Sequence, residues 1–492
     1  MSRTLYVCNG PVLTQVSPPS FSRSLSIVDG RISEIDAEQP KNAEVLDLGG
    51  CVLVPGFVDS HLHLVQGACG MGEVDLREVN SKEEFRRVLL AAEKDVKQGN
   101  WLIAHGWTQE TLGAMPNVDW FPEELTAPVL CYRVDFHSAI VNTVALKLIP
   151  EQSVRAVAGG DEFSKGIVKE DALYSVVCPL IPELSSSQKI ARTTKKLDEM
   201  QTLGITLVGT MEDLADVEDV LQQIPLQDHM RIRVMCLDDA NKENADRCSV
   251  ASSNSLLKVT GFKAFLDGSL GSRTAKMYEP WNDTSGSGVW AGIGASGTVS
   301  SWTKHVVSLG FSPVLHAIGD EAVGAALHAF RNICSHGCPR IEHAQFIAEH
   351  DIQQVETVMF GVQPLHQPDD KRIAESAVGK ERAAQLHNWR RMLDAGAILS
   401  FGSDWPVAEA NPIAAMRVAI SNGVTAEEAL EASTSAACAS LDRSLTGKLS
   451  VGSYADMVVL DCNPLQCDWE QTQPKVIMTF LAGKRVYTKD TE

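Results

Sequence analysis

Two histidines near the start of the chain are spaced so that both could bind one metal ion. Residues 58–63 read Val-Asp-Ser-His-Leu-His and continue an apolar, β-rich segment. Side chains two residues apart on a strand project from the same face, so His61 and His63 can present two imidazole rings to one cation. A histidine on a strand is also often an ordinary core or surface residue, so the pair alone leaves both interpretations open.

Residue types that bind metals also close three later apolar segments. His316 ends the segment 313–316, His343 lies near the end of 340–344, and Asp404 directly follows 397–403. Taken singly, each could be a strand-end cap or a core residue. Because barrels of parallel strands assemble their active sites at the carboxyl ends of the strands, the agreement of four strand ends favours one shared metal centre.

Lys263 lies in the middle of the apolar segment 258–266, where a charged side chain is unexpected. Barrel strands are covered on both faces, and a buried ammonium costs free energy unless it is paired or neutralised. Two interpretations stay open. Lys263 could form an ordinary ion pair with Asp267 or another carboxylate, or it could be a lysine carbamate that bridges metal ions.

The segments that carry these residues alternate with helical patterns, which predicts an α/β fold of parallel strands covered by helices. Eight strands close a (β/α)₈ TIM barrel, and eight segments qualify. We expect the barrel to occupy residues 56–444. The predicted strands are 52–63, 205–211, 231–237, 258–266, 313–316, 340–344, 359–363 and 397–403.

Two further parts of the chain lie outside this alternation. The first two predicted strands are separated by far more chain than a βα connection needs, which predicts an insertion at about 80–195 over the barrel mouth, with strands at 102–106 and 129–134. Short β-rich segments at both ends of the chain are too few to fill a core alone. We therefore expect residues 1–55 and 445–492 to form one small composite β-sandwich domain.

The bulk composition limits the partners. The 492 residues are 44% hydrophobic, enough for one large and one small domain. The 43 basic and 63 acidic residues give a formal net charge of −20, which argues against nucleic-acid or anionic-membrane partners and leaves a small-molecule substrate. No window reaches the roughly 18 apolar residues of a membrane span, and no cleavable leader is evident, so we expect a cytoplasmic protein. A homo-oligomer is compatible with the sequence.

The twelve cysteines fall at irregular spacings, which favours free thiols over disulfides. One cluster, Cys334-Ser-His336-Gly-Cys338, could bind a metal but lacks a second pair of ligands.

The candidate ligands resemble the metal-ligand set of the amidohydrolase superfamily, in order along the chain. These residues are His61, His63, Lys263, His316, His343 and Asp404. Further motifs resemble amidohydrolase family 3, the subgroup that contains N-substituted formamide deformylases. They are the residues 53–63, Asp267-Gly-Ser-Leu-Gly-Ser-Arg273, Leu315-His-Ala-Ile-Gly-Asp, Ile341-Glu-His-Ala-Gln, Gln363-Pro, Gly402-Ser-Asp-Trp-Pro-Val and Asp135-Phe-His137-Ser-Ala-Ile-Val-Asn142.

This resemblance implies a hydrolase that uses one or two divalent ions, most often zinc. The metal would lower the pKa of bound water and polarise the substrate carbonyl. Asp404 would be both a ligand and the catalytic proton acceptor, Lys263 would be carboxylated, and His316 or His343 would stabilise the oxyanion. His137 and Arg273 would contact the substrate, unless they only pack or cap their loops. Specificity does not follow from the family.

The resemblance leaves three functions open. The first is hydrolysis of a non-peptide carbon–nitrogen bond in an amide or N-substituted formamide. A second is deamination of a cyclic amidine, although such enzymes usually use one metal and no lysine carbamate. A third is a non-catalytic binding or regulatory protein on the same scaffold.

Overall fold

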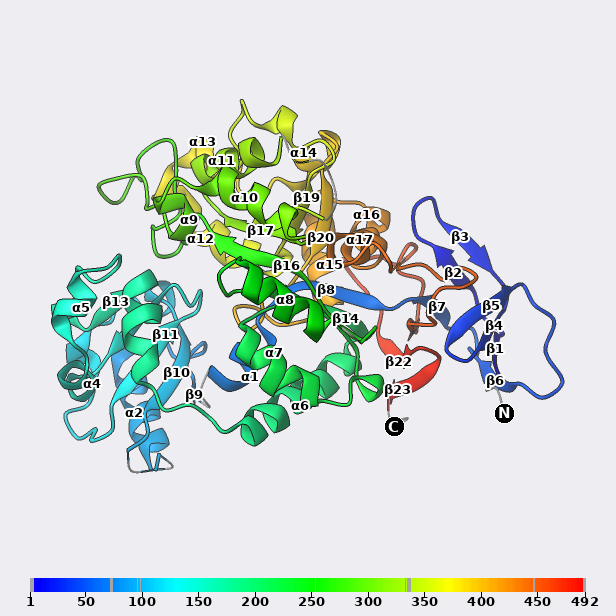
Figure 1. The fold of residues 1–492 in the computed structure, drawn as a ribbon, viewed down its shortest axis with the longest axis horizontal. Helices are drawn as coiled ribbons and strands as arrows, with labels where there is room; N and C mark the ends of the chain where they lie inside the picture. The colour runs from blue at the N-terminus through cyan, green and yellow to red at the C-terminus, as the bar shows by residue number, and fades with distance from the viewer. Residues whose placement is uncertain are drawn as a thin grey trace.

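The computed structural model describes residues 4–70, 74–94, 96–97, 99–252, 254–331, 333, 338–445 and 447–489. Three parts follow one another along the long axis (Figure 1). Both chain ends lie in a β-rich part at one end, a barrel occupies the middle, and an insertion lies at the other end. Most of the cysteine cluster 334–338 lies outside the described residues, so that predicted metal loop stays a prediction. Cys338 alone is described, and it is buried.

Eight parallel strands form the barrel, and each pairs with the next in chain order. A bridge from Leu62 to Trp405 joins the last strand region to the first. The predicted (β/α)₈ barrel is therefore confirmed. The strands are β8 (Phe57–Leu62), β14 (Ile205–Glu212), β15 (Arg231–Cys236), β16 (Leu257–Phe265), β17 (Ser312–Ala317), β18 (Arg340–His343), β19 (Met359–Val362) and β20 (Ile398–Phe401).

The first predicted strand, 52–63, is in fact two strands. β7 (Val52–Pro55) belongs to a terminal sheet, and β8 begins the barrel two residues later. Gly56 lies between them, where a Cβ atom would come within 2.2 Å of Oγ1 of Thr206. Only glycine fits at this crossing, so a continuous apolar run is divided between two sheets.

Helices cover the outside of the barrel and bury its two main apolar clusters. Among the described residues, no helix is long and apolar enough to cross a membrane. The helices outside the insertion are α1 (Leu64–Gly70), α6 (Ser186–Thr202), α7 (Leu214–Asp219), α8 (Lys242–Ala251), α9 (Gly292–Ala295), α10 (Val299–Ser308), α11 (Asp320–Phe330), α12 (Gln367–Val378), α13 (Lys380–Ala383), α14 (Trp389–Asp394), α15 (Pro412–Ser421), α16 (Ala426–Ala432) and α17 (Ser435–Leu441).

The two ends of the chain combine in one β-rich part. A four-stranded sheet has the order β5-β4-β1-β6, and a six-stranded sheet has the order β23-β22-β21-β7-β2-β3, in which C-terminal β21 pairs with N-terminal β7. Arg231 of the barrel binds the carboxylate of Asp456 at 2.6 Å and joins this part to the barrel. The strands are β1 (Thr4–Cys8), β2 (Val12–Gln15), β3 (Ser20–Ser22), β4 (Leu25–Val28), β5 (Arg31–Ile35), β6 (Glu44–Asp47), β21 (Met457–Leu460), β22 (Val476–Leu481) and β23 (Lys484–Thr488).

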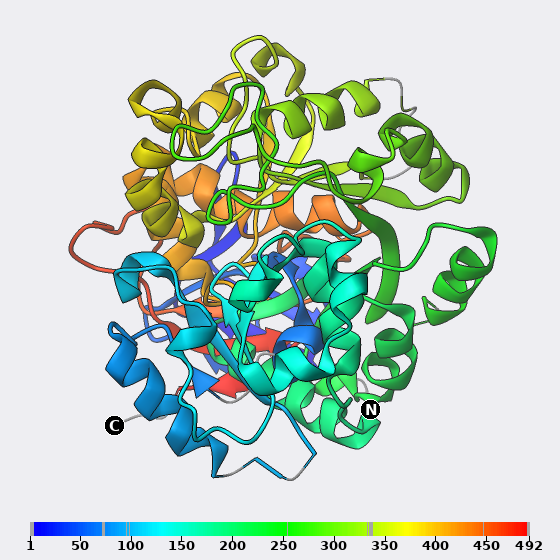
Figure 2. The same cartoon turned by 90° about the vertical axis from the view of Figure 1, so that its left-hand side faces the viewer.

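The insertion is built around its own five-stranded sheet, with an apolar cluster on each face. Seen from the end opposite the terminal sheets, it lies in front of the barrel (Figure 2). Its sheet includes both strands predicted there, and α6, which follows it, packs against barrel strand β14. Its elements are β9 (Val74–Asp75), α2 (Lys82–Glu93), β10 (Leu102–Trp107), α3 (Gln109–Leu112), β11 (Val129–Arg133), β12 (Ser138–Val141), α4 (Thr143–Leu148), α5 (Glu151–Arg155) and β13 (Ile167–Lys169).

Candidate active site

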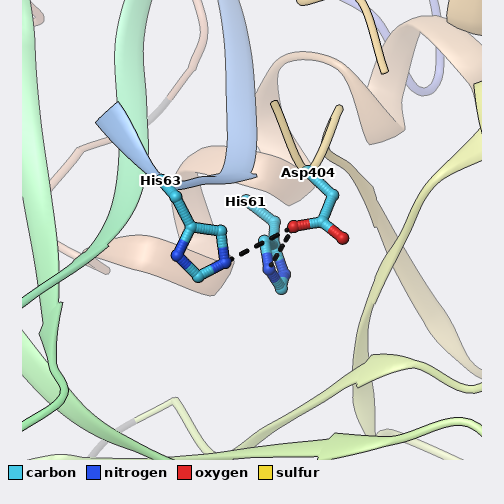
Figure 3. A group of neighbouring side chains, drawn as sticks. All are labelled: His61, His63 and Asp404. Atoms are coloured by element: carbon cyan, nitrogen blue, oxygen red, sulfur yellow. Dashed lines mark ion pairs between the residues drawn. The ribbon is translucent and has the colours of Figure 1, made fainter. Parts of the chain in front are cut away.

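Three predicted ligands meet where the first and last barrel strands end. Nε2 of His61 lies 3.3 Å from Oδ1 of Asp404, and Nε2 of His63 lies 3.5 Å from the same oxygen (Figure 3). Backbone bonds hold this corner, because the amide of Asp404 donates to the carbonyl of His61 at 2.7 Å and that of His63 donates to Trp405 at 2.8 Å. The three donor atoms all lie within 4.8 Å of one another, so they could hold one cation.

A second donor set shares Asp404 and includes a residue that the sequence analysis missed. Donor atoms of His343, His366 and Asp404 also lie within 4.8 Å of one another. His366 ends the short 3₁₀ helix η8 (Pro364–His366), directly after β19. The Gln363-Pro motif points to this loop, and a histidine just after a barrel strand end was the available signal.

His316 lies beside the second set but outside it. Its ring centroid is 4.4 Å from that of His343, and its Nε2 donates to the carbonyl of Gly268 at 3.1 Å. That bond leaves the lone pair of His316 on Nδ1. The structure therefore places His316 next to the donor sets without making it part of either one.

Lys263 is buried at the same centre. Only 4% of the residue is exposed, and its Nζ has no hydrogen-bond partner among the described residues. The ion pair with Asp267, one of the two interpretations left open, is not formed, since that carboxylate accepts bonds from the backbone amides of Ile318, Gly319 and Lys276. Burial lowers the pKa of Lys263 to about 8, against the opposing charges of Glu342 and Asp404.

Glu342 orients His61 and was not predicted. Its Oε2 lies 2.5 Å from Nδ1 of His61, and its Oε1 accepts from Nε of Arg340 at 2.5 Å. Burial opposes its charge, but Arg340 and His61 outweigh burial and lower the pKa of Glu342 to about 2. Because an ionised carboxylate only accepts, Nδ1 of His61 is the donor to Glu342, and Nε2 is the nitrogen that faces Asp404 and would bind a cation. Gly361 makes room, since a Cβ there would lie 2.0 Å from Oε2.

Gln363 has the same role for His343. Its Oε1 lies 2.9 Å from Nδ1 of His343, and its Nε2 donates to the carbonyl of Gly361 at 3.0 Å, which fixes the orientation of the amide. Nε2 of His343 is therefore left with a lone pair. Burial holds the pKa of His343 well below its usual value, as it does for His316, so both rings are neutral at neutral pH.

Asp404 is ionised and faces His61, whose pKa is raised because the charges of Glu342 and Asp404 outweigh burial. Burial opposes the charge of Asp404, but the charge of His61 and the hydrogen bonds from His61 and His63 hold the pKa of Asp404 well below its usual value. Its backbone has φ of +55°, in the left-handed region that is strained for a non-glycine residue. A rare backbone conformation at this point holds the carboxylate beside the donor atoms of His61 and His63.

The insertion brings His137 to the centre. Its ring centroid lies 5.4 Å from that of His316, and its Nδ1 donates to Oε2 of Glu170 at 3.1 Å. Burial disfavours the charged ring, but Glu170 and Asp135 outweigh burial and raise the pKa of His137 to about 9. A charged imidazolium therefore lies beside the candidate ligands.

The other polar residues picked out around the insertion have structural contacts. The guanidinium of Arg273 binds Asp283 at 2.7 Å and the carbonyl of Leu270 at 2.7 Å, so it holds its own loop. Asn142, at the end of the motif that contains His137, caps α4 by accepting from the amide of Ala145. These contacts favour the loop-capping interpretation of Arg273, and its contact with substrate stays a prediction.

The donors at this centre fit a divalent cation. They are imidazole nitrogens and a carboxylate, the ligands that zinc and similar ions prefer. Three further atoms here are buried without a hydrogen-bond partner among the described residues, which is expensive unless a ligand completes them. They are Nδ1 of His63, Nζ of Lys263 and Nε2 of His366.

A (β/α)₈ barrel with these donors at the strand ends is the architecture of a metal-dependent hydrolase. The chain belongs to the amidohydrolase family, whose model matches residues 44–487, and the predicted resemblance is confirmed. It is 30% identical to Protein LONG AFTER FAR-RED 3 of Arabidopsis thaliana, over 98% of this chain and 91% of the relative. It is 24% identical to the N-substituted formamide deformylase of Arthrobacter pascens, over 99% of both chains.

Among solved structures, an uncharacterised metal-dependent hydrolase from Pyrococcus furiosus is 28% identical with a TM-score of 0.73. The match covers 94% of this chain and 100% of that one. Together with the donor sets, these similarities support a hydrolase that uses a divalent metal.

Proposed function

We propose that this protein hydrolyses a non-peptide carbon–nitrogen bond in an amide or N-substituted formamide and releases a carboxylate and an amine. The observation that carries the proposal is the position of Asp404, whose Oδ1 lies 3.3 Å from His61 and 3.5 Å from His63 and which belongs to both donor sets. A carboxylate shared in this way can take a proton at the point where the reacting atoms would lie. The formamide-cleaving relative from Arthrobacter pascens supports the substrate class.

Zinc is the proposed metal, one ion or two. His61, His63 and Asp404 would hold one ion, and His343, His366 and Asp404 would hold the other, with His316 beside them. When bound, a divalent cation supplies Lewis acidity, which lowers the pKa of water and polarises a carbonyl. Carboxylated Lys263 would add an anionic bridge, consistent with a buried amine that has no partner among the described residues.

Asp404 accepts the proton of the attacking water and returns it to the leaving amine. The low pKa of Asp404 keeps it ionised at neutral pH, which is the form that accepts a proton. Glu342 and Gln363 hold the rings of His61 and His343 in the orientation that leaves their Nε2 atoms free. His137, charged through Glu170, contacts the substrate carbonyl or the carboxylate product.

A substrate panel tests this proposal against its alternatives. The zinc-loaded protein is offered N-formyl amines, N-acyl amino acids, lactams and cyclic amidines, and the release of carboxylate, amine and ammonia is measured. We expect carboxylate and amine from a formamide or amide. Ammonia from an amidine alone would instead indicate a deaminase. If no compound of the panel is hydrolysed and the protein also binds no zinc, the result would indicate a binding or regulatory protein.

Paired variants show that the measured activity belongs to this centre. His61→Ala should abolish turnover, because it removes a donor from the set shared with Asp404. His305→Ala, at an exposed position on the outer helix α10, should leave turnover unchanged. Equal activity of both variants would mean that the hydrolysis comes from elsewhere.

A further inference from the structure

A second polar cluster lies beside the candidate metal centre and has no part in the mechanism above. Gln345 follows β18, Asp370 lies in the first turn of α12, and His387 precedes α14. Nε2 of Gln345 and Nε2 of His387 both donate to Oδ2 of Asp370, at 2.9 Å and 2.8 Å. The backbone amide of His387 also donates to the carbonyl of Gln345 at 2.9 Å. Hydrogen bonds thus connect three separate segments of the chain at the carboxylate of Asp370.

Two atoms of this cluster lack the hydrogen bonds that their chemistry requires. Oε1 of Gln345 and Nδ1 of His387 are buried with no partner among the described residues, and each residue is only 4% exposed. Oε1 of an amide can only accept a hydrogen bond. Nε2 of His387 donates to Asp370, so in the ring with a single proton Nδ1 is an acceptor as well. Two enclosed acceptors therefore lack a donor, and such groups are rarely left unsatisfied.

The cluster is connected directly to the donor sets. Gln345 lies two residues after His343, and Asp370 lies four residues after His366 where η8 continues into α12. Residues four apart on a helix are neighbours on one face. The cluster therefore adjoins the second donor set, at the side of the barrel mouth formed by the segments after β18 and β19.

We propose that Gln345, Asp370 and His387 form a subsite that binds a protonated amine on the leaving half of the substrate, which rests on the proposed hydrolysis of amides or formamides. An ammonium group supplies several N–H donors for the two acceptors, and the Asp370 carboxylate supplies the opposite charge. The favoured substrates are thus N-acyl or N-formyl diamines and similar amines that carry a second cationic group. An uncharged alkyl group of the same length would leave the acceptors unpaired.

Equilibrium binding tests the subsite without relying on turnover. Calorimetry on the full-length, zinc-loaded protein compares putrescine with n-pentylamine, in which a methyl group replaces one ammonium. Cadaverine and n-hexylamine form a second pair, one methylene longer. The members of a pair have one amine in common, so their difference isolates the second ammonium. We expect the diamine to bind at least about 10-fold more tightly in one of the pairs. Equal binding in both pairs would overturn the proposal and would indicate buried water instead.

Matched variants locate the effect. Asp370→Asn and Gln345→Met should remove most of the preference for the diamine. Asp369→Asn makes the same chemical change one residue earlier, at an exposed side chain. This control variant should retain the preference for the diamine. Melting curves and zinc content show whether each variant is folded. A preference unchanged in a folded Asp370→Asn or Gln345→Met protein would overturn the assignment to this cluster.

Kinetics then separate this inference from the proposed function. The wild type should hydrolyse N-formylputrescine with kcat/KM about 10- to 100-fold above that for N-formylpentylamine, and Asp370→Asn should reduce this ratio toward unity. Selective diamine binding without hydrolysis of either compound would uphold the subsite and contradict the proposed reaction. Hydrolysis of both compounds with equal kcat/KM would uphold the proposed reaction and contradict the subsite.

Discussion

Nδ1 of His61 lies 2.5 Å from Oε2 of Glu342, so a buried carboxylate two barrel strands away from Asp404 decides which nitrogen of His61 is free. Arg340 holds that carboxylate from its other side at 2.5 Å. The contact connects residues that are 281 positions apart in the chain. It orients a candidate ligand that the histidine spacing alone could only suggest.

Glu342→Gln tests this role. The amide can still accept a bond from His61, but it loses the negative charge that favours donation from Nδ1, so zinc affinity should fall by about 10- to 100-fold. Competition with a fluorescent chelator measures the change. Glu349→Gln, at an exposed glutamate seven residues later, is the matched control and should have wild-type affinity. Unaltered zinc affinity in Glu342→Gln would show that Glu342 only neutralises Arg340.

Asp404→Asn tests the proposed proton acceptor. The amide keeps an oxygen near His61 and His63 but is a very weak base, so kcat should fall by about 100-fold or more while most of the zinc stays bound. Steady-state kinetics and metal analysis on the same preparation give both quantities. Near-normal turnover would remove Asp404 from the mechanism.

Lys263 is predicted to be carboxylated in the zinc-loaded protein. With its pKa lowered to about 8, roughly a tenth of the amine is neutral at pH 7 and can add carbon dioxide. Lys263→Ala should lose about one equivalent of zinc and most activity, and a short carboxylic acid should restore part of the activity. A full complement of zinc in this variant would contradict the bridging role, as would an unmodified amine in an electron-density map of the wild type.

His137 and Asn142 should separate function from stability. His137→Ala should lower kcat/KM without changing zinc content, because its ring lies beside His316 and not among the donor sets. Asn142→Ala should mainly lower Tm, because Asn142 caps α4 and bonds to the amide of Val129. Kinetics and thermal melting on both variants make the comparison. An unchanged kcat/KM in folded His137→Ala would end its assignment as a substrate contact.

Glu212 is predicted to make stability depend on pH. It is buried at the end of β14, where Oε1 accepts from Val65 and Thr210, and burial raises its pKa to about 8. A carboxyl whose folded pKa exceeds its unfolded value stabilises the fold below the unfolded pKa, and this contribution is lost as pH rises through about 8. Glu212→Gln keeps an accepting oxygen without a charge to bury. Its Tm should therefore match the wild type near pH 5 and exceed it by a few degrees near pH 9.

The matched change Glu199→Gln, at an exposed position on α6, should shift Tm little at either pH. A difference between Glu212→Gln and the wild type that is the same at both pH values would contradict this account of Glu212.

Sequence patterns could predict the site residues whose placement depends on local spacing within one strand or at its end. His61 and His63 follow from strand periodicity, and His316, His343 and Asp404 follow from their positions at strand ends. The contact of Glu342 with His61 could not be predicted, because it depends on which strands face each other across the closed barrel. Gly56 was overlooked for a similar reason, since the side chain that excludes a Cβ there belongs to Thr206 on another strand.

The polar contacts that side chains make in loops were harder still to predict from the sequence. Arg273 and His137 both lie in motifs shared with the family, yet Arg273 binds Asp283 within its own loop while His137 reaches the barrel centre. His366 was missed because a proline two residues earlier reads as the start of an ordinary helix and not as part of a site. Loop conformation is set by packing against distant segments, which local spacing does not encode.

The dependence of amide or formamide hydrolysis on a bound divalent ion tests the central claim most directly. Amine release from the best substrate is measured on wild-type protein stripped with a chelator, and again after zinc is restored in counted equivalents. The donor sets predict turnover near zero in the stripped protein and recovery in proportion to zinc, complete at one or two equivalents per chain. Turnover that survives complete removal of metal, or that no divalent ion restores to a folded protein, would contradict the account.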